Sequence, residues 1–183
     1  SGHSINIVSE ISADQLVIAS GALLNHSHSI TFTLNDGTGD DMIVNGTYVT
    51  NGAIPAGTGN YIVNNAGIIR VDANTGSNAD NLAFSSNNRV LFKSGSVFQW
   101  NTNVIFETIG TSYFAIDPSE MERPIFRISV NNLNVGSNSS TTINGLLEVT
   151  GSVLWTNTGP KIFRDGITGT GNITQTEAGV FRI

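Results

Sequence analysis

Short apolar runs, and not a helical stripe, dominate the pattern of this chain. Apolar residues rarely recur at the spacing of a helix face, and Gly, Asn and β-branched residues interrupt each window that could form a helix. A unit of one apolar run, a glycine and a second apolar run recurs instead, first as Leu16-Val17-Ile18, Gly21 and Leu23-Leu24. Further copies are centred on Gly46, Gly67, Gly95, Gly145 and Gly151. The pattern predicts an all-β protein built from short strands.

The spacing of these units predicts how the strands are arranged. Gly21, Gly46, Gly67 and Gly95 are separated by 25, 21 and 28 residues, which suits one coil of a solenoid with loops of variable length. Coils stacked about 4.8 Å apart share a continuous core, and glycine permits the tight corner between two strands of a coil. We therefore expect a parallel β-helix in a single domain over residues 1–183, right-handed by the usual chirality of parallel crossovers.

An antiparallel β-sandwich is the alternative fold. The pairs Asn45-Gly46, Asn51-Gly52 and Asn144-Gly145 favour it, because two-residue hairpins of type I′ prefer Asn-Gly. Against it, several apolar runs lack the alternation of polar and apolar residues that strands with one solvated face show.

The segment from Glu107 to Arg127 departs from the repeat. Pro118 and Pro124 interrupt it, and Asp117-Pro118-Ser119-Glu120 resembles the start of a helix, with proline early and acidic residues in the first turn. We expect residues 107–127 to form an excursion from the coil. The apolar end at Ile183, with no turn after it, also suggests a fragment of a longer chain.

The charge balance excludes some partners. The chain has 14 acidic and 8 basic residues and a net charge of −6, so a nucleic acid backbone is repelled on average. No run of 18 apolar residues occurs, so we expect no membrane insertion. Cysteine is absent, which excludes disulfides, thiolate metal sites and a cysteine nucleophile.

Two segments resemble a known repeat. The runs Val130-Asn131-Asn132-Leu133-Asn134-Val135 and Thr142-Ile143-Asn144-Gly145-Leu146-Leu147-Glu148-Val149 resemble repeats in large secreted adhesin-like proteins of Bacteroidota, and Ile43 to Gly52 is similar to the same unit. The resemblance implies a parallel β-helix passenger or stalk region at the cell surface or outside the cell. It also implies an extracellular glycan or protein as the partner.

Two acidic loops are candidate Ca²⁺ sites. Asp36-Gly37-Thr38-Gly39-Asp40-Asp41 resembles one copy of the glycine-rich calcium repeat of β-rolls, and the loop from Asp72 to Asp80 places oxygen side chains at alternate positions. In each loop, an ordinary polar turn without a metal is the alternative. The candidate ligands are Asp36, Asp40, Asp41, Asp72, Asn74, Asn78 and Asp80.

An enzyme would need paired carboxylates, or a base beside a cation. Glycosidases place two carboxylates across a cleft, and lyases stabilise an anionic intermediate. The candidates lie in and beside the excursion, where a solvated charged loop is the alternative: Glu107, Asp117, Glu120, Glu122 and Arg123. The pattern favours a protein without enzymatic activity.

Aromatic and histidine residues offer two further candidates. Trp100, Tyr113 and Trp155 could form a platform for sugar rings, or could pack in the interior of the coil. His26 and His28 lie on the same side of a strand and could bind a transition metal, or could mark an exposed strand edge.

The function expected from these observations is structural. We expect a non-enzymatic stalk or adhesive module of a secreted or cell-surface bacterial protein. A carbohydrate-binding or polysaccharide-cleaving β-helix and a segment of a trimeric fibre are the alternatives.

Overall fold

The described part of the chain consists of strands, turns and bends. The computed structural model describes residues 2–27, 29–50, 55–72, 90–103, 123–135, 141–143, 145–156, 159, 161–176 and 181–183, and within these it contains no helix. The prediction of an all-β protein is confirmed for this part of the chain.

The strands in the described part of the chain form five sheets. The largest contains, in spatial order, β1 (Ser4–Ile7), β4 (Leu23–His26), β7 (Thr47–Thr50), β10 (Ile68–Val71), β12 (Val97–Trp100), β13 (Ile125–Ile128), β16 (Leu146–Val149) and β19 (Ile167–Thr168). In the N-terminal half, β2 (Ile11–Ala13), β5 (Phe32–Leu34) and β8 (Ala56–Gly57) form a second sheet, and β3 (Leu16–Ile18), β6 (Met42–Val44), β9 (Tyr61–Val63) and β11 (Val90–Phe92) form a third. In the C-terminal half, β14 (Leu133–Val135), β17 (Ser152–Trp155) and β20 (Asn172–Gln175) form one sheet, and β15 (Thr141–Ile143), β18 (Lys161–Phe163) and β21 (Phe181–Arg182) form another.

Every strand pairing in the described residues is parallel, which makes the antiparallel sandwich wrong for this part of the chain. The Asn45-Gly46 pair does not form a hairpin, because the strands on its two sides, β6 and β7, belong to different sheets. The other two Asn-Gly pairs include residues outside the described part.

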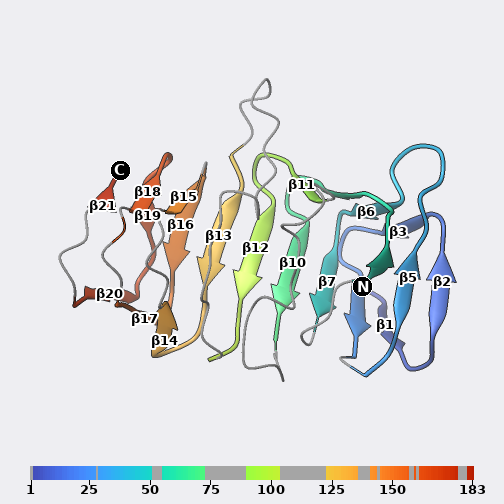
Figure 1. Ribbon diagram of the computed structural model, residues 1–183, viewed down its shortest axis with the longest axis horizontal. Helices are drawn as coiled ribbons and strands as arrows, with labels where there is room; N and C mark the ends of the chain where they lie inside the picture. The colour runs from blue at the N-terminus through green and yellow to red at the C-terminus, as the bar shows by residue number, and fades with distance from the viewer. Residues whose placement is uncertain are drawn as a thin grey trace.

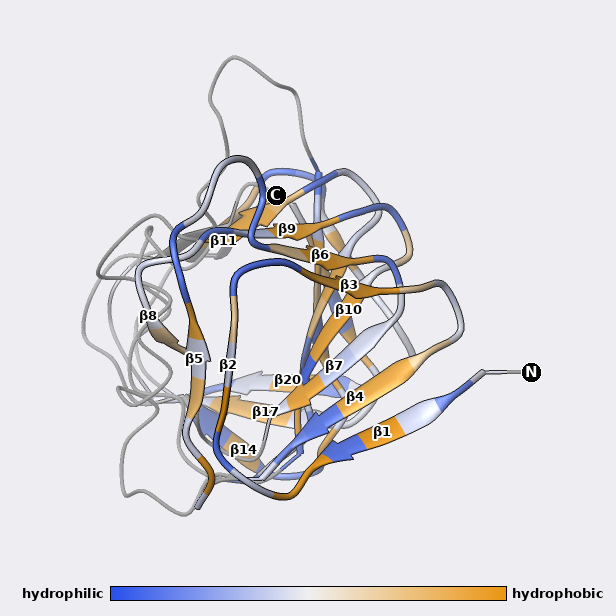
Figure 2. Cartoon of the chain, turned by 90° about the vertical axis from the view of Figure 1, so that its right-hand side faces the viewer, coloured by the Kyte–Doolittle hydropathy of each residue, from blue (hydrophilic) through white to orange (hydrophobic). Residues whose placement is uncertain are grey.

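The chain visits the sheets in a fixed order and then returns to the first. We call one such set of consecutive strands a rung; β4, β5 and β6 form one rung, and β7, β8 and β9 form the next. The eight-stranded sheet therefore runs along the length of the molecule (Figure 1). Figure 2 shows the three N-terminal sheets arranged around a common interior.

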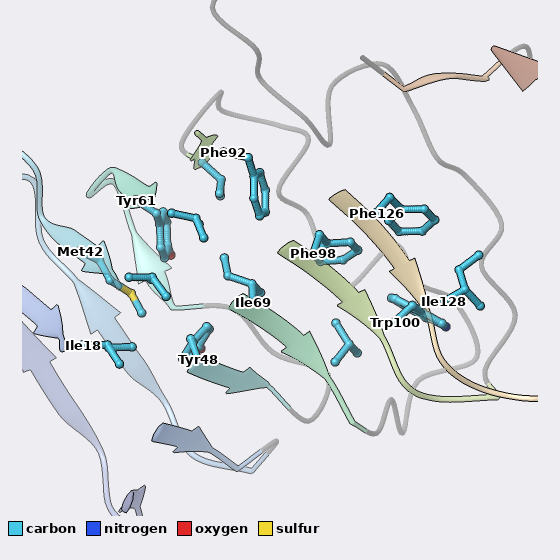
Figure 3. Packing of buried hydrophobic residues seen from close by; sticks show 14 of the residues in the cluster. Ile18, Met42, Tyr48, Tyr61, Ile69, Phe92, Phe98, Trp100, Phe126 and Ile128 are labelled. Carbon is cyan, nitrogen blue, oxygen red and sulfur yellow. The ribbon is translucent and has the colours of Figure 1, made fainter. Parts of the chain in front are cut away.

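The core forms because the register places inward side chains in columns. In the eight-stranded sheet, Leu24 pairs with Tyr48, Tyr48 with Ile69, and Ile69 with Phe98. These four side chains are buried. Burial alternates along β4 and β10, whereas Val49 beside Tyr48 and Val97 beside Phe98 are buried as well. Phe98 also stacks on Phe126 of the next strand, with ring centroids 5.6 Å apart and an angle of 10° between the planes. Figure 3 shows Tyr48, Ile69, Phe98 and Phe126 among the buried side chains that pack between the strands.

Glycine forms the corners, as the sequence predicts. Gly95 has a φ of +76°, a backbone conformation in which a Cβ would be strained. At the equivalent corner, a Cβ on Gly67 would overlap the carbonyl oxygen of Val44 in the preceding rung. Close stacking therefore requires glycine at Gly67, whereas the positive φ of Gly95 favours glycine without requiring it, since Ala66 has a φ of +62° at the neighbouring corner.

The predicted excursion of residues 107–127 overlaps a strand at its C-terminal end. Ile125–Ile128 is strand β13, which pairs with β12 and β16 in the eight-stranded sheet. Pro124 precedes this strand, where its missing N–H is tolerated. Residues 107–122 lie outside the described part, so the predicted helical turn stays a prediction.

Candidate functional site

The first predicted calcium loop is organised around a buried carboxylate. Asp41 is fully buried, and its two carboxylate oxygens accept hydrogen bonds from the backbone N–H groups of Gly37 at 2.9 Å and Asn60 at 2.6 Å. Asp36 and Asp40 are exposed. Asp41 therefore ties its own turn to the next rung, while the other two acids of the loop face solvent.

The second predicted calcium loop begins at a carboxylate that also binds protein groups. The oxygens of Asp72 accept hydrogen bonds from Nε and Nη2 of Arg70, each at 2.7 Å, and one of them accepts a third from the Asn101 amide at 3.0 Å. Asn74, Asn78 and Asp80 lie outside the described residues. Within the described residues, no group of three His, Cys, Asp or Glu side chains is placed to hold a metal ion.

Polar side chains elsewhere also connect one rung to the next. Arg127 Nε donates to Glu148 Oε2 at 2.9 Å across the pair β13 and β16, and Asn64 donates to the Asn45 side chain at 2.8 Å. Arg123, one of the catalytic candidates, forms an ion pair with Asp165 at 3.0 Å. In these contacts the charged and amide groups bind each other along the stack and do not converge on a cleft.

A buried hydrogen-bond chain includes His26. Its Nε2 lies 2.8 Å from the carbonyl oxygen of Ile30, which can only accept, so Nε2 carries the proton. Nδ1 then accepts from the hydroxyl of Tyr48 at 2.7 Å. Burial raises the pKa of Tyr48 well above its ordinary value, Tyr61 raises it further, and a hydrogen bond from Thr50 lowers it. The chain of groups lies inside the core and joins β4 to β7.

This arrangement corrects the predictions for the histidine pair. The described residues show His26 neither at an exposed strand edge nor in a metal site, because the side chain is fully buried and both ring nitrogens are occupied. His28 lies outside the described part. The alternation of strand residues could have indicated that His26 faces inward, since it follows Leu24 by two positions.

The structure places two of the three predicted sugar-binding aromatics in the core. Trp100 and Trp155 are both 0 % exposed, so neither indole face is accessible to a sugar ring. Trp155 contacts Phe163 edge-on, with ring centroids 5.9 Å apart. Core packing, the alternative interpretation, describes both residues. Tyr113 lies outside the described residues, as do Glu107, Asp117, Glu120 and Glu122.

One hollow is formed at the N-terminal end of the sheets. It has a volume of about 270 Å³ and is lined mostly by aliphatic side chains of the first two rungs, among them Ile5, Leu16, Ile18 and Leu24. His3 is the only titratable residue in its lining. Its chemistry suits an apolar contact and offers no pair of groups for acid and base catalysis.

Comparison with family models, with curated proteins and with solved structures gave no match. Among the described residues, no helix has the length and apolar character needed to cross a membrane.

Proposed function

We propose that this chain is a parallel β-solenoid that acts as a non-enzymatic structural or adhesive module of a secreted or cell-surface bacterial protein. The coil is right-handed, by the general chirality of parallel crossovers. The parallel pairing of all described strands and the return of the chain to the same sheet in each rung support this architecture.

The hydrogen bonds of the polar side chains are the main support for a structural function. Among the described residues, four groups with acid–base chemistry each hydrogen-bond to a residue of a neighbouring rung, namely Asp41, Asp72, Glu148 and His26. Catalytic acids and bases need access to a substrate in a cleft. These groups stabilise the stack instead, which suits a rigid spacer or a scaffold that presents loops.

The partner expected for such a module is an extracellular glycan or protein. The net charge of −6 disfavours nucleic acid and anionic membranes. Asp36 and Asp40 are exposed at the tip of the loop between β5 and β6, a position from which a scaffold presents groups to a partner.

Small-angle X-ray scattering, combined with assays for polysaccharide cleavage, tests this proposal. We expect an elongated particle whose scattering is the same with Ca²⁺ and with chelator, and no release of reducing sugar from acidic or neutral polysaccharides. Release of sugar would replace the proposal with the polysaccharide-cleaving alternative. A contraction or expansion on chelation would instead make Ca²⁺ a structural component.

A further inference from the structure

The four-stranded sheet of the N-terminal half has an apolar outer face. The middle residue of each of its strands points outward and is aliphatic, and the register places the four residues in one column: Val17, Ile43, Ile62 and Leu91. We call these four residues the apolar column. The strands therefore have apolar residues on both faces, which explains why their runs lack the alternation of polar and apolar residues.

Ile43 and Ile62 show that the apolar column reaches the surface. Each lies between two neighbouring strands and is half-buried, while the residues before and after it in its strand are buried. The outward positions of β2 and β5 are instead Ser12 and Thr33, and the eight-stranded sheet mixes polar and apolar residues on its outer face. Figure 2 shows β3 and β6 side by side, both in the colours of hydrophobic residues. An apolar patch with a polar rim marks an interaction site.

Exposed carboxylates border the apolar column at one end of its strands. Asp14 precedes β3, Asp40 lies in the loop before β6, and both are exposed. The two turns lie side by side, because the Gln15 side chain donates to the carbonyl oxygen of Thr38 at 3.3 Å. Residues 1–69 contain five acidic residues and no Lys or Arg, so this part of the sequence has no basic side chain to neutralise the carboxylates.

The opposite margin of the column has no charge at its centre. Asn45 follows β6 and Asn64 follows β9, and their side chains form a hydrogen bond of 2.8 Å. An occupant of the column therefore meets negative charge along one margin and amide groups along the other.

We propose that the apolar column is a docking surface for a basic amphipathic helix of a partner protein. This inference rests on the proposed function, a scaffold for an extracellular glycan or protein, and it specifies a protein segment as the partner. A helix is an element that packs on the face of a sheet. Its apolar face covers the column, and Lys or Arg residues along one edge of the helix lie beside Asp14 and Asp40.

The dimensions of a helix suit the column. Strands about 4.8 Å apart place Val17 and Leu91 about 14 Å from each other, a length that a helix of about ten residues spans. One helical turn rises about 5.4 Å, so about one apolar residue per turn meets each strand. Four partly exposed side chains offer much less than the roughly 800 Å² per partner of a stable interface between proteins, and a second copy of this chain has the same negative charge. A short basic segment fits this surface better.

Binding of model peptides to the intact chain tests the proposal. The probe is a fluorescent helical peptide of Leu and Lys, with Leu on one face, and its binding is measured by anisotropy at low and high salt. We expect the peptide to bind at low salt and its affinity to fall as the salt concentration increases. A peptide with Glu in place of Lys, and a Leu and Lys peptide of scrambled order, are expected to bind at least tenfold more weakly.

Four variants locate the contact. Ile62→Thr keeps a β-branched residue but removes apolar surface, and it is expected to weaken peptide binding about tenfold. Its matched control is Leu154→Thr, which changes a half-buried outward side chain of another sheet. Asp40→Lys is expected to weaken binding to a similar extent at low salt. Glu10→Lys makes the same change of charge at an exposed residue between β1 and β2, and is the control for Asp40→Lys. Circular dichroism and melting curves establish that each variant is folded.

Several outcomes would overturn the inference. An elongated particle that binds no peptide refutes the docking surface and leaves the proposed function in place, whereas release of sugar from polysaccharides by a chain that binds the Leu and Lys peptide refutes only the proposed function. Equal binding of the Glu peptide, or an equal loss of binding in either control variant, refutes the apolar column as the site. Self-association of the chain that Ile62→Thr abolishes would assign the column to a second copy instead.

Discussion

Replacing Asp41 tests whether the acidic loop from Asp36 to Asp41 is stabilised by protein groups or by a metal ion. Asp41→Ala removes the acceptor for two backbone N–H groups, those of half-buried Gly37 and exposed Asn60. Hydrogen bonds to a charged acceptor contribute about 1.5–3 kcal/mol each, so we expect a loss of about 3–6 kcal/mol of unfolding free energy. Asp41→Asn keeps one acceptor oxygen but turns an NH₂ group toward the other donor, so about half of this loss is expected.

Asp40→Asn is the matched control. Asp40 is adjacent in sequence and exposed, and surface substitutions usually change stability by less than about 0.5 kcal/mol. Urea unfolding, followed by tryptophan fluorescence, measures the unfolding free energy of all three variants. Fluorescence reports unfolding because Trp100 and Trp155 are buried in the folded chain. The expected order of stability is wild type and Asp40→Asn together, then Asp41→Asn, then Asp41→Ala, both with Ca²⁺ and with chelator.

Two results would refute this reasoning. A loss below about 1 kcal/mol for Asp41→Ala would show that the two backbone hydrogen bonds contribute little. If Ca²⁺ increased the unfolding free energy of the wild type by mass action, and Asp41→Ala abolished this increase, Asp41 would be a metal ligand.

Three further predictions concern the core. Tyr48→Phe removes the donor to His26 Nδ1 and is expected to cost about 1–3 kcal/mol in urea unfolding, whereas an unchanged midpoint would mean that the bond is absent. Because the pKa of Tyr48 is raised in the folded chain, its contribution to stability is complete below the unfolded pKa near 10 and is lost as the pH rises above it; the melting temperature should fall there, less steeply in Tyr48→Phe. Trp155→Ala should cost about 3–5 kcal/mol and leave glycan binding, where any is measured, unchanged; a selective loss of binding would return Trp155 to a ligand site.

The sequence predicted the fold best at positions where the backbone allows few residue types. The recurrence of glycine between two apolar runs predicted the corners at Gly67 and Gly95, because close stacking excludes a Cβ at Gly67 and a positive φ disfavours one at Gly95. The apolar runs predicted short buried strands for the same reason that they excluded a helix. The Asn45-Gly46 pair favoured the alternative sandwich fold, yet it forms a corner between two sheets and not a hairpin.

The role of individual polar side chains could not be predicted because it depends on register. Nothing local indicates that the Asp41 carboxylate accepts from a residue 19 positions away, or that Tyr48 lies opposite His26. A buried aspartate and a calcium ligand have the same local sequence, a glycine-rich acidic turn. Only the stacking of one rung on another separates the two.

The most direct test of the account is a measurement of how distance grows along the eight-stranded sheet. The chain has no cysteine, so pairs of spin labels can be attached through cysteines introduced at Asn6, Gln99 and Thr168, which the register places in one outward column. With strands about 4.8 Å apart, the backbone separation should be about 19 Å between Asn6 and Gln99, four strands apart, and about 34 Å between Asn6 and Thr168, seven strands apart. Distances from pulsed electron–electron double resonance that increase in this proportion would support the parallel stack. Two similar distances, or a shorter distance for Asn6 and Thr168 than for Asn6 and Gln99, would contradict it.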